Sequence, residues 1–158
     1  MKRDCDAWQN RGNRVLCVQL DFDSATGRLA AYGEFLQQVR ALLPEKWMLG
    51  VTGLMDWVNH KDVVMASDVV DELVLQTYQG SKPVPDLQRY LKQLARSGPP
   101  LVVPFKLGWV EGDSGEMPDA IREHPLFRGE VVFLLRDLPS DPKRAEPQRV
   151  EPQKVTIR

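Results

Sequence analysis

Five short runs of apolar and β-branched residues, separated by segments with helical periodicity, constrain the fold of this chain most strongly. The runs cover residues 14–22, 47–53, 72–78, 101–108 and 130–136. Each run is nearly continuous in apolar character, which is typical of strands buried on both faces of a parallel sheet. Strands that alternate with helices form right-handed βαβ units, so we predict an α/β fold whose parallel sheet has about five strands.

Apolar residues recur at helical spacing between these runs. The expected helices cover residues 28–43, 60–70 and 87–96, and Pro118 opens a last short one. Pro44 ends the first helix, and Asp86 is the expected N-cap of the third. The spacing of strands and helices suits the repeating unit of a (β/α) barrel, so we predict a partial TIM-type barrel. A small open doubly wound sheet is the alternative architecture.

The chain is expected to divide into a polar N-terminal lead (residues 1–13), the barrel domain (14–138) and a flexible tail or linker rich in proline and charge (139–158). A complete barrel needs more strands than these, because the fold closes with eight. The first and last strands are therefore expected to be open edges. Such edges invite self-association or pairing with a partner chain.

Composition excludes several classes of function. The 158 residues carry a net charge of −1, which gives no basic surface for nucleic acid. No apolar run is long enough to span a membrane, and the N-terminus as it stands has no signal-peptide core, so the compartment stays open. Cys5 and Cys17 form no metal or redox motif, and we expect Cys17 to be a small buried residue. The sequence predicts no metal site and, without a glycine-rich phosphate loop, no cofactor.

Polar residues gather late in the first strand, where Gln19, Asp21 and Asp23 share one parity. The carboxyl ends of parallel strands carry the functional sites of (β/α) barrels. We therefore expect this parity to face a site. The structural alternative is that these carboxylates only cap helices or pair with neighbouring groups.

The next three strands repeat the arrangement. Their late polar or aromatic residues are Asp56 and Trp57, then Gln76 and Tyr78, then Lys106 and Trp109. Lys106 either belongs to the site or neutralises one of the aspartates. Each tryptophan either packs in the core or stacks on a sugar. Paired carboxylates beside aromatic rings favour carbohydrate chemistry, in which glycoside cleavage uses one acid and one charged carboxylate. His60 and His124 lie far from the acids in sequence and are expected at the surface.

The stretches "QLDFDSA" and "LVLQTYQG" resemble motifs of the chitinase-like glycoside hydrolase barrels. Asp21 and Asp23 match the two aspartates of the Asp-x-Asp-x-Glu motif, and Tyr78 matches the tyrosine of the Met-x-Tyr-Asp motif. Ala25 stands where those enzymes have their proton-donating glutamate. The resemblance leaves three alternatives: another acid serves, the barrel binds sugar without cutting it, or only the fold is shared.

A resemblance that covers more of the chain is to the bacterial family DUF3142, a domain of unknown function. It rests on the blocks "VQLDFDSATGRLAAYGEFLQQVRALLP", "VTGLMDWV", "VDELVLQTYQG", "PFKLGWVEG" and "HPLFRGEVVFLL", in that order. The family is predicted to form a glycosidase-like barrel, so the resemblance implies that fold. Its members extend further at the N-terminus, which implies a truncated barrel or an assembly that covers the open edges.

The leading functional hypothesis is a glycoside-hydrolase-like barrel that acts on or binds carbohydrate. Asp21 is its central carboxylate and Asp23 tunes it. The expected ligand-binding residues are Gln19, Asp56, Gln76, Tyr78 and Lys106, with Trp57 or Trp109 for stacking. The alternatives are a non-catalytic carbohydrate-binding or interaction module, and a barrel fragment without activity.

Overall fold

The computed structural model describes residues 2–63, 69–80, 82–96, 101–112 and 116–134, and it confirms the α/β class with a parallel sheet of five strands. The strands of this sheet are β1 (Cys17–Asp21), β2 (Met48–Leu54), β3 (Glu72–Gln76), β6 (Phe105–Val110) and β7 (Phe127–Phe133). A short antiparallel pair, β4 (Tyr78–Gln79) and β5 (Lys82–Pro83), follows β3. The fifth strand of this sheet, β7, lies three residues earlier than predicted, at residues 127–133 rather than 130–136.

The helical elements are α1 (Lys2–Asn10), η1 (Thr26–Arg28), α2 (Leu29–Leu42), η2 (Met55–Asn59), α4 (Leu87–Leu94) and α5 (Asp119–Arg122). The predicted helices over 28–43 and 87–96 and the one opened by Pro118 are confirmed, with shifted ends. The helix expected over 60–70 lies partly outside the described residues, and η2 precedes it. Asp86 is the N-cap residue of α4, as expected, but its backbone is left-handed (φ 58°) and its carboxylate makes no capping hydrogen bond.

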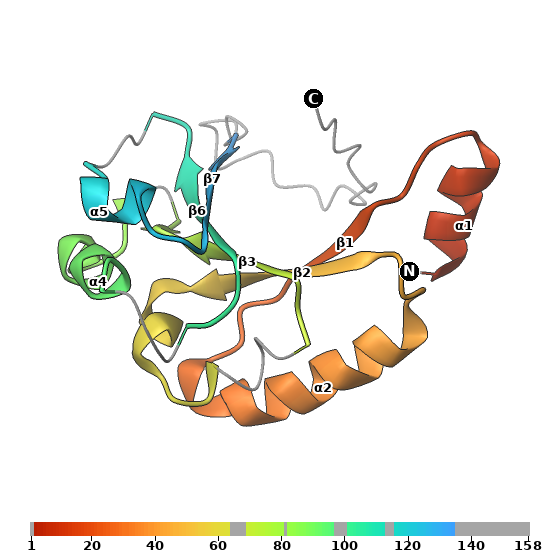
Figure 1. The fold of residues 1–158 in the computed structure, drawn as a ribbon, viewed down its shortest axis with the longest axis horizontal. Coiled ribbons are helices and arrows are strands. Elements are labelled where there is room, and N and C mark those ends of the chain that lie inside the picture. The colour runs from red at the N-terminus through yellow and green to blue at the C-terminus, as the bar shows by residue number, and fades with distance from the viewer. Residues whose placement is uncertain (1, 64–68, 81, 97–100, 113–115, 135–158) are drawn as a thin grey trace, which may run out of the picture.

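The strands lie in the sheet in the order β1-β2-β3-β6-β7, which is their order along the chain. In Figure 1, α2 runs along one side of the curved sheet, and α4 and α5 continue around it. A doubly wound sheet reverses its strand order so that helices cover both faces. The unreversed order therefore favours a segment of a (β/α) barrel over the doubly wound alternative.

The hydrophobic core lies between the helices and the face of the sheet that we call the outer face. Its largest contributors from the strands are Leu49, Val51, Leu73, Leu75, Phe105 and Leu107, and from α2 they are Leu29, Tyr32 and Leu36. The opposite, inner face carries Gln19, Asp21, Thr52, Val74, Gln76, Lys106 and Phe133, as the register of the strands requires. None of the helices in the described ranges is long and apolar enough to cross a membrane.

The two edge strands are not buried on both faces as predicted. β2, β3 and β6 are largely buried, but exposed and half-buried residues alternate along β1 and β7. An edge strand has a neighbour on one side only, so fewer side chains cover it. Cys17 is consequently exposed, which corrects the expectation that it is buried.

Helix α1 occupies most of the polar N-terminal lead (residues 1–13). Cys5 of this helix is half-buried and packs against the core, so the lead belongs to the folded unit. The predicted tail (residues 139–158) lies outside the described residues.

Candidate functional site

The inner face brings the polar residues of β1, β2 and β3 together near the carboxyl ends of these strands. Asp21 is paired with Thr52 in the register of the sheet, and Leu54 is paired with Gln76. The amide Nε2 of Gln19 donates a hydrogen bond of 3.0 Å to the hydroxyl of Thr52. Gln19 and Asp21 therefore share a face, as their parity predicted, and Asp21 is exposed there.

The carboxylate of Asp21 affects the pKa of two tyrosines in different elements, Tyr32 of α2 and Tyr78 of β4. Burial raises the pKa of Tyr32 to about 12, and the nearby carboxylate of Asp21 adds to this rise. Burial also raises the pKa of Tyr78, again with a contribution from Asp21 and a smaller one from Asp23, while a side-chain hydrogen bond with Gln76 opposes it. The negative charge of Asp21 therefore disfavours the ionised form of both Tyr32 and Tyr78.

Tyr32 contributes a polar group that sequence analysis missed. Its ring is buried in the first turns of α2, between Phe22 and Trp57, with ring centroids 5.6 and 5.8 Å away. Its hydroxyl is buried and has no hydrogen-bond partner in the part of the chain that the structure describes. In the sequence, Tyr32 looks like one more member of the apolar stripe of its helix, so periodicity gave no signal for this role.

Phe133 is the second residue that sequence analysis missed. It ends β7 on the inner face, and its ring lies 5.7 Å from that of Tyr78, at an angle of 56°. Gly108 makes room for it: a Cβ at Gly108 would lie 2.9 Å from Cε2 of Phe133 and 3.2 Å from Cγ1 of Val74. Both Tyr78 and Phe133 are half-buried, so this aromatic pair stands beside the polar residues at the carboxyl end of the sheet.

The two tryptophans do not offer rings for stacking. Trp57 is 0% exposed and its Nε1 donates a hydrogen bond of 3.1 Å to the carbonyl of Ser24. Trp109 lies within β6, not beyond it, and is buried on the outer face, with its Nε1 donating to Oε1 of Glu130 at 2.9 Å. Both tryptophans therefore pack in the core rather than stack on a sugar, because a sugar needs an accessible ring face.

Asp23 and Asp56 lie after β1 and β2, as expected, but in different surroundings. Asp23 is exposed in the loop after β1. Asp56 lies in η2, and its Oδ2 accepts a hydrogen bond of 2.5 Å from the hydroxyl of Thr26. Its Oδ1 is buried and has no partner among the described residues. The hydrogen bond of Asp56 therefore links η2 to η1, whereas the side chain of Asp23 is exposed to solvent.

Lys106 does not neutralise either aspartate. Its Nζ forms an ion pair of 2.9 Å with Oε1 of Glu72, the first residue of β3. Both side chains are partly buried on the inner face, toward the amino ends of the strands. Lys106 therefore lies on the predicted face but belongs to a different part of it from Asp21.

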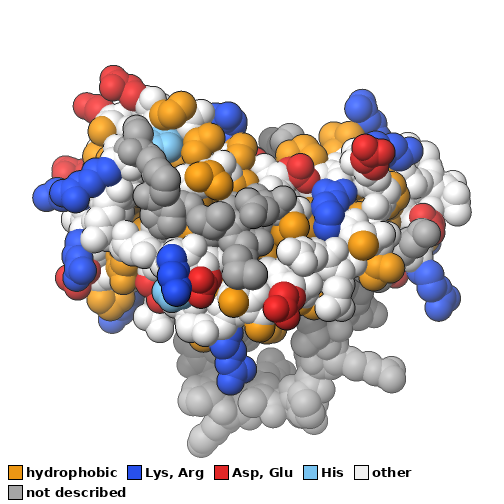
Figure 2. Space-filling model, turned by 60° about the horizontal axis from the view of Figure 1, so that its bottom comes forward, with side chains coloured by type: hydrophobic (Ala, Val, Ile, Leu, Met, Phe, Trp, Pro, Cys, Tyr) orange, Lys and Arg blue, Asp and Glu red, His pale blue; other side chains and the backbone are white. Residues whose placement is uncertain are grey.

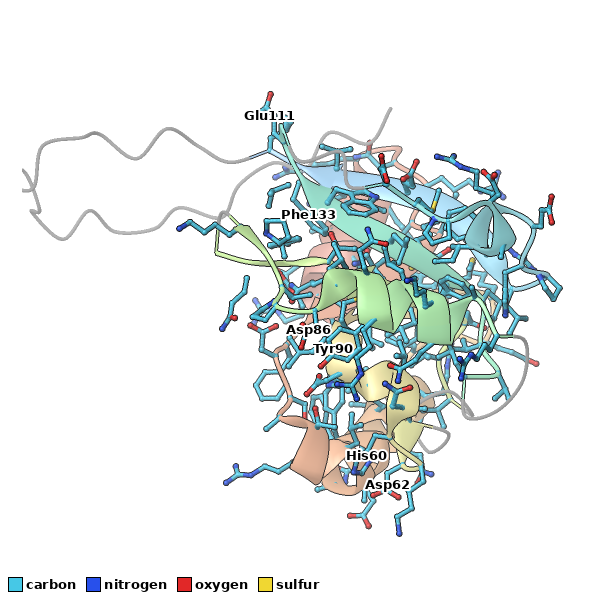
Figure 3. All side chains as sticks on the ribbon, turned by 90° about the vertical axis from the view of Figure 1, so that its left-hand side faces the viewer. His60, Asp62, Asp86, Tyr90, Glu111 and Phe133 are labelled. Atoms are coloured by element: carbon cyan, nitrogen blue, oxygen red, sulfur yellow. The ribbon has the colours of Figure 1, made fainter. Side chains whose placement is uncertain are left out.

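The histidines occupy separate places. His60 is half-buried and lies 3.8 Å from the carboxylate of Asp62; Figure 3 shows this pair at the end of the molecule opposite Phe133. His124 is buried against the ring of Phe105, which corrects its expected surface position. Burial lowers the pKa of His124. Within the described ranges, no group of His, Cys, Asp and Glu is arranged to hold a metal ion.

Charged side chains of both signs are mixed on one side of the molecule. On the side shown in Figure 2, acidic, basic and hydrophobic side chains are interspersed. This agrees with the net charge of −1 over the chain.

Comparison with known proteins identifies a family but no function. No curated protein and no solved structure matches the chain. The model of one family, described as a domain of unknown function (DUF3142), matches residues 2–98. The match includes α1, β1, α2, β2, β3 and α4, and ends before β6. Because it covers more than half of the chain, the protein belongs to the DUF3142 family of domains of unknown function.

Proposed function

We propose that the chain binds a carbohydrate on the inner face, at the carboxyl ends of β1, β3 and β7. The observation that carries the proposal is the juxtaposition of an exposed carboxylate, Asp21, with the polar residues of β2 and β3 and with the aromatic pair of Tyr78 and Phe133. Neutral sugars are recognised by carboxylate and amide groups that bind their hydroxyls and by aromatic rings that cover their apolar faces. This site has both kinds of group.

Each group has a defined task in this proposal. Asp21 and Gln76 bind sugar hydroxyls, and the pair of Tyr78 and Phe133 forms the stacking platform. Phe133 replaces the tryptophans in that role because its ring lies on the inner face.

Hydrolysis is the second candidate activity. It is favoured by the two exposed carboxylates, Asp21 and Asp23, whose charges both act on Tyr78. A glycoside hydrolase would need one of them, or another acid, in the protonated form. Ala25 occupies the position of the acid in the chitinase-like motif, so binding without cleavage is the primary proposal.

Titration calorimetry with neutral β-linked oligosaccharides of glucose and of N-acetylglucosamine tests binding. We expect Asp21→Asn and Phe133→Ala each to weaken binding at least tenfold, while Asp62→Asn, a carboxylate at the far end of the molecule, leaves it unchanged. Chromatography of the same mixtures detects cleavage. Products that disappear in Asp21→Asn would establish the hydrolase, and the absence of binding to any of these sugars refutes both candidates.

A further inference from the structure

The free edge of β1 is an unprotected strand edge. β1 pairs only with β2, so one side of the strand has no hydrogen-bonding strand among the described residues. Natural edge strands are usually blunted by lysine, proline or a bulge. The strand CVQLD contains no lysine and no proline, and its register with β2 is regular throughout.

The other edge strand, β7, is protected. Its pairing with β6 contains a register shift, and Gly129 within it has a φ of +106°. Arg128 and Glu130 are exposed on either side of that glycine. An irregular, charged edge resists pairing with another chain. The two edges therefore differ, and β1 is the one suited to association.

An apolar strip accompanies the free edge of β1. The exposed fractions are 54% for Leu16, 60% for Phe22, 48% for Phe35 and 69% for Leu42. Leu16 and Phe22 flank β1, whereas Phe35 and Leu42 lie on α2. The ring of Tyr32 joins the two elements, because its centroid lies 5.6 Å from that of Phe22 and 6.0 Å from that of Phe35. We call these four exposed residues the β1–α2 strip.

The strip continues along the helix in a row of uncharged residues. Ala31, Phe35, Gln38 and Leu42 recur at spacings of four, three and four residues, so they share one face of α2. All four are exposed, and the exposed Glu34 borders the row beside Ala31 and Gln38. An uncharged row of this kind beside an open strand edge is the surface that a second sheet edge with its own covering helix would bury.

We infer that two copies of this chain associate through β1, antiparallel about a two-fold axis perpendicular to the sheet. The strip is complementary to itself in this arrangement. Leu16 and Phe22 each lie three residues from Gln19. A pair of β1 strands centred on Gln19 therefore places Leu16 of one copy opposite Phe22 of the other. Asp21 lies opposite Cys17, so no two like charges face each other.

The same axis brings the two α2 helices together. Paired strands are about 4.8 Å apart. Because α2 connects β1 with β2, it covers the groove between them, about half a strand spacing inside the edge. The two α2 axes would then lie about 10 Å apart, the distance at which helices pack. Antiparallel packing sets Phe35 of one copy against Leu42 of the other. The inner face, with its candidate site, stays open, so this inference is independent of the proposed function.

Sedimentation velocity of the full chain over a range of concentrations tests the association. We expect a dimer that dissociates on dilution, with Phe35→Glu/Leu42→Glu sedimenting as a monomer. Val102→Glu, which charges an apolar residue of similar exposure far from the strip, should remain dimeric. A wild-type chain that is monomeric at every concentration, or a double variant with the wild-type mass, overturns the inference.

Cross-linking tests the geometry in a background of Cys5→Ser and Cys17→Ser. Gln38 lies beside the two-fold axis between the helices, so Gln38→Cys should form a disulfide-linked dimer on mild oxidation. Gln37→Cys is the matched control, because Gln37 is also exposed but points about 100° away around the helix. If Gln37→Cys cross-links as fast as Gln38→Cys, the helices do not meet in this way.

Discussion

Replacing Gly53 by alanine should destabilise the fold by forcing Trp57 out of its place in the core. A Cβ at Gly53 would lie 2.5 Å from Cε3 of Trp57 and 2.9 Å from Cδ1 of Leu73. Real Cβ atoms are never so close to a neighbour, so either the strand or the indole must shift. The indole is fully buried and its Nε1 donates to the carbonyl of Ser24 in the loop after β1. Its displacement would therefore disturb that loop as well.

Three contributions set the size of the effect. Overpacking a core costs about 1–3 kcal/mol. Loss of the hydrogen bond from Trp57 adds about 0.5–1.5 kcal/mol. The stiffer unfolded chain of an alanine variant returns about 0.4–1 kcal/mol. The expected net loss in the free energy of unfolding is therefore about 0.5–4 kcal/mol, measured by urea denaturation.

Gly50 offers a matched control in the same strand. A Cβ at Gly50 would have its nearest neighbour, Sγ of Cys17, at 3.6 Å, which is an ordinary contact. Gly50→Ala should therefore unfold at the wild-type urea concentration or slightly above it. If Gly53→Ala and Gly50→Ala have the same denaturation midpoint, the close packing of Trp57 on Gly53 is refuted.

Two further predictions concern buried polar groups. Burial lowers the pKa of His124 below its ordinary value of 6.5, so its contribution to stability is present above pH 6.5 and is lost as pH falls through the lower folded-state pKa. His124→Asn should therefore lose less in melting temperature than the wild type between about pH 7 and pH 5, and an equal loss in the two proteins would contradict this effect of burial. Asp71→Ala removes the carboxylate that accepts a 2.7 Å hydrogen bond from the backbone N–H of the buried Leu49, and should lower the free energy of unfolding in urea by about 1–3 kcal/mol. An unchanged denaturation midpoint for this variant would show that water replaces the carboxylate.

Local pattern alone predicted most of the secondary structure. The apolar stripe of α2 and the amphipathic spacing of α4 are properties of neighbouring residues, and both helices form within a few residues of the expected ends. The alternation of strands and helices likewise predicted a parallel sheet, because parallel strands need crossover connections. The parity of β1 placed Gln19 and Asp21 on one face, as the sheet shows.

The composition of the candidate site depended on distant parts of the chain. Trp57 follows β2, at a position where a ligand-binding residue is expected to be exposed. Its indole is instead buried in the core, where Gly53 has no side chain and so leaves room for it. Phe133 stands beside Tyr78 only because the register of β7 on β6 brings their elements together. No spacing in the sequence encodes that register.

The sequence by itself thus determined most of the segments that become helices and strands, their arrangement in a parallel sheet, and that the first and last strands are its edges. Tertiary structure decided the order of the strands and how far the side chains of the edge strands are covered, and hence that Cys17 is exposed although its run is apolar. It also decided that Lys106 pairs with Glu72 rather than with an aspartate. The physical reason is that periodicity reports local backbone geometry, whereas burial and pairing depend on contacts between residues far apart in the chain.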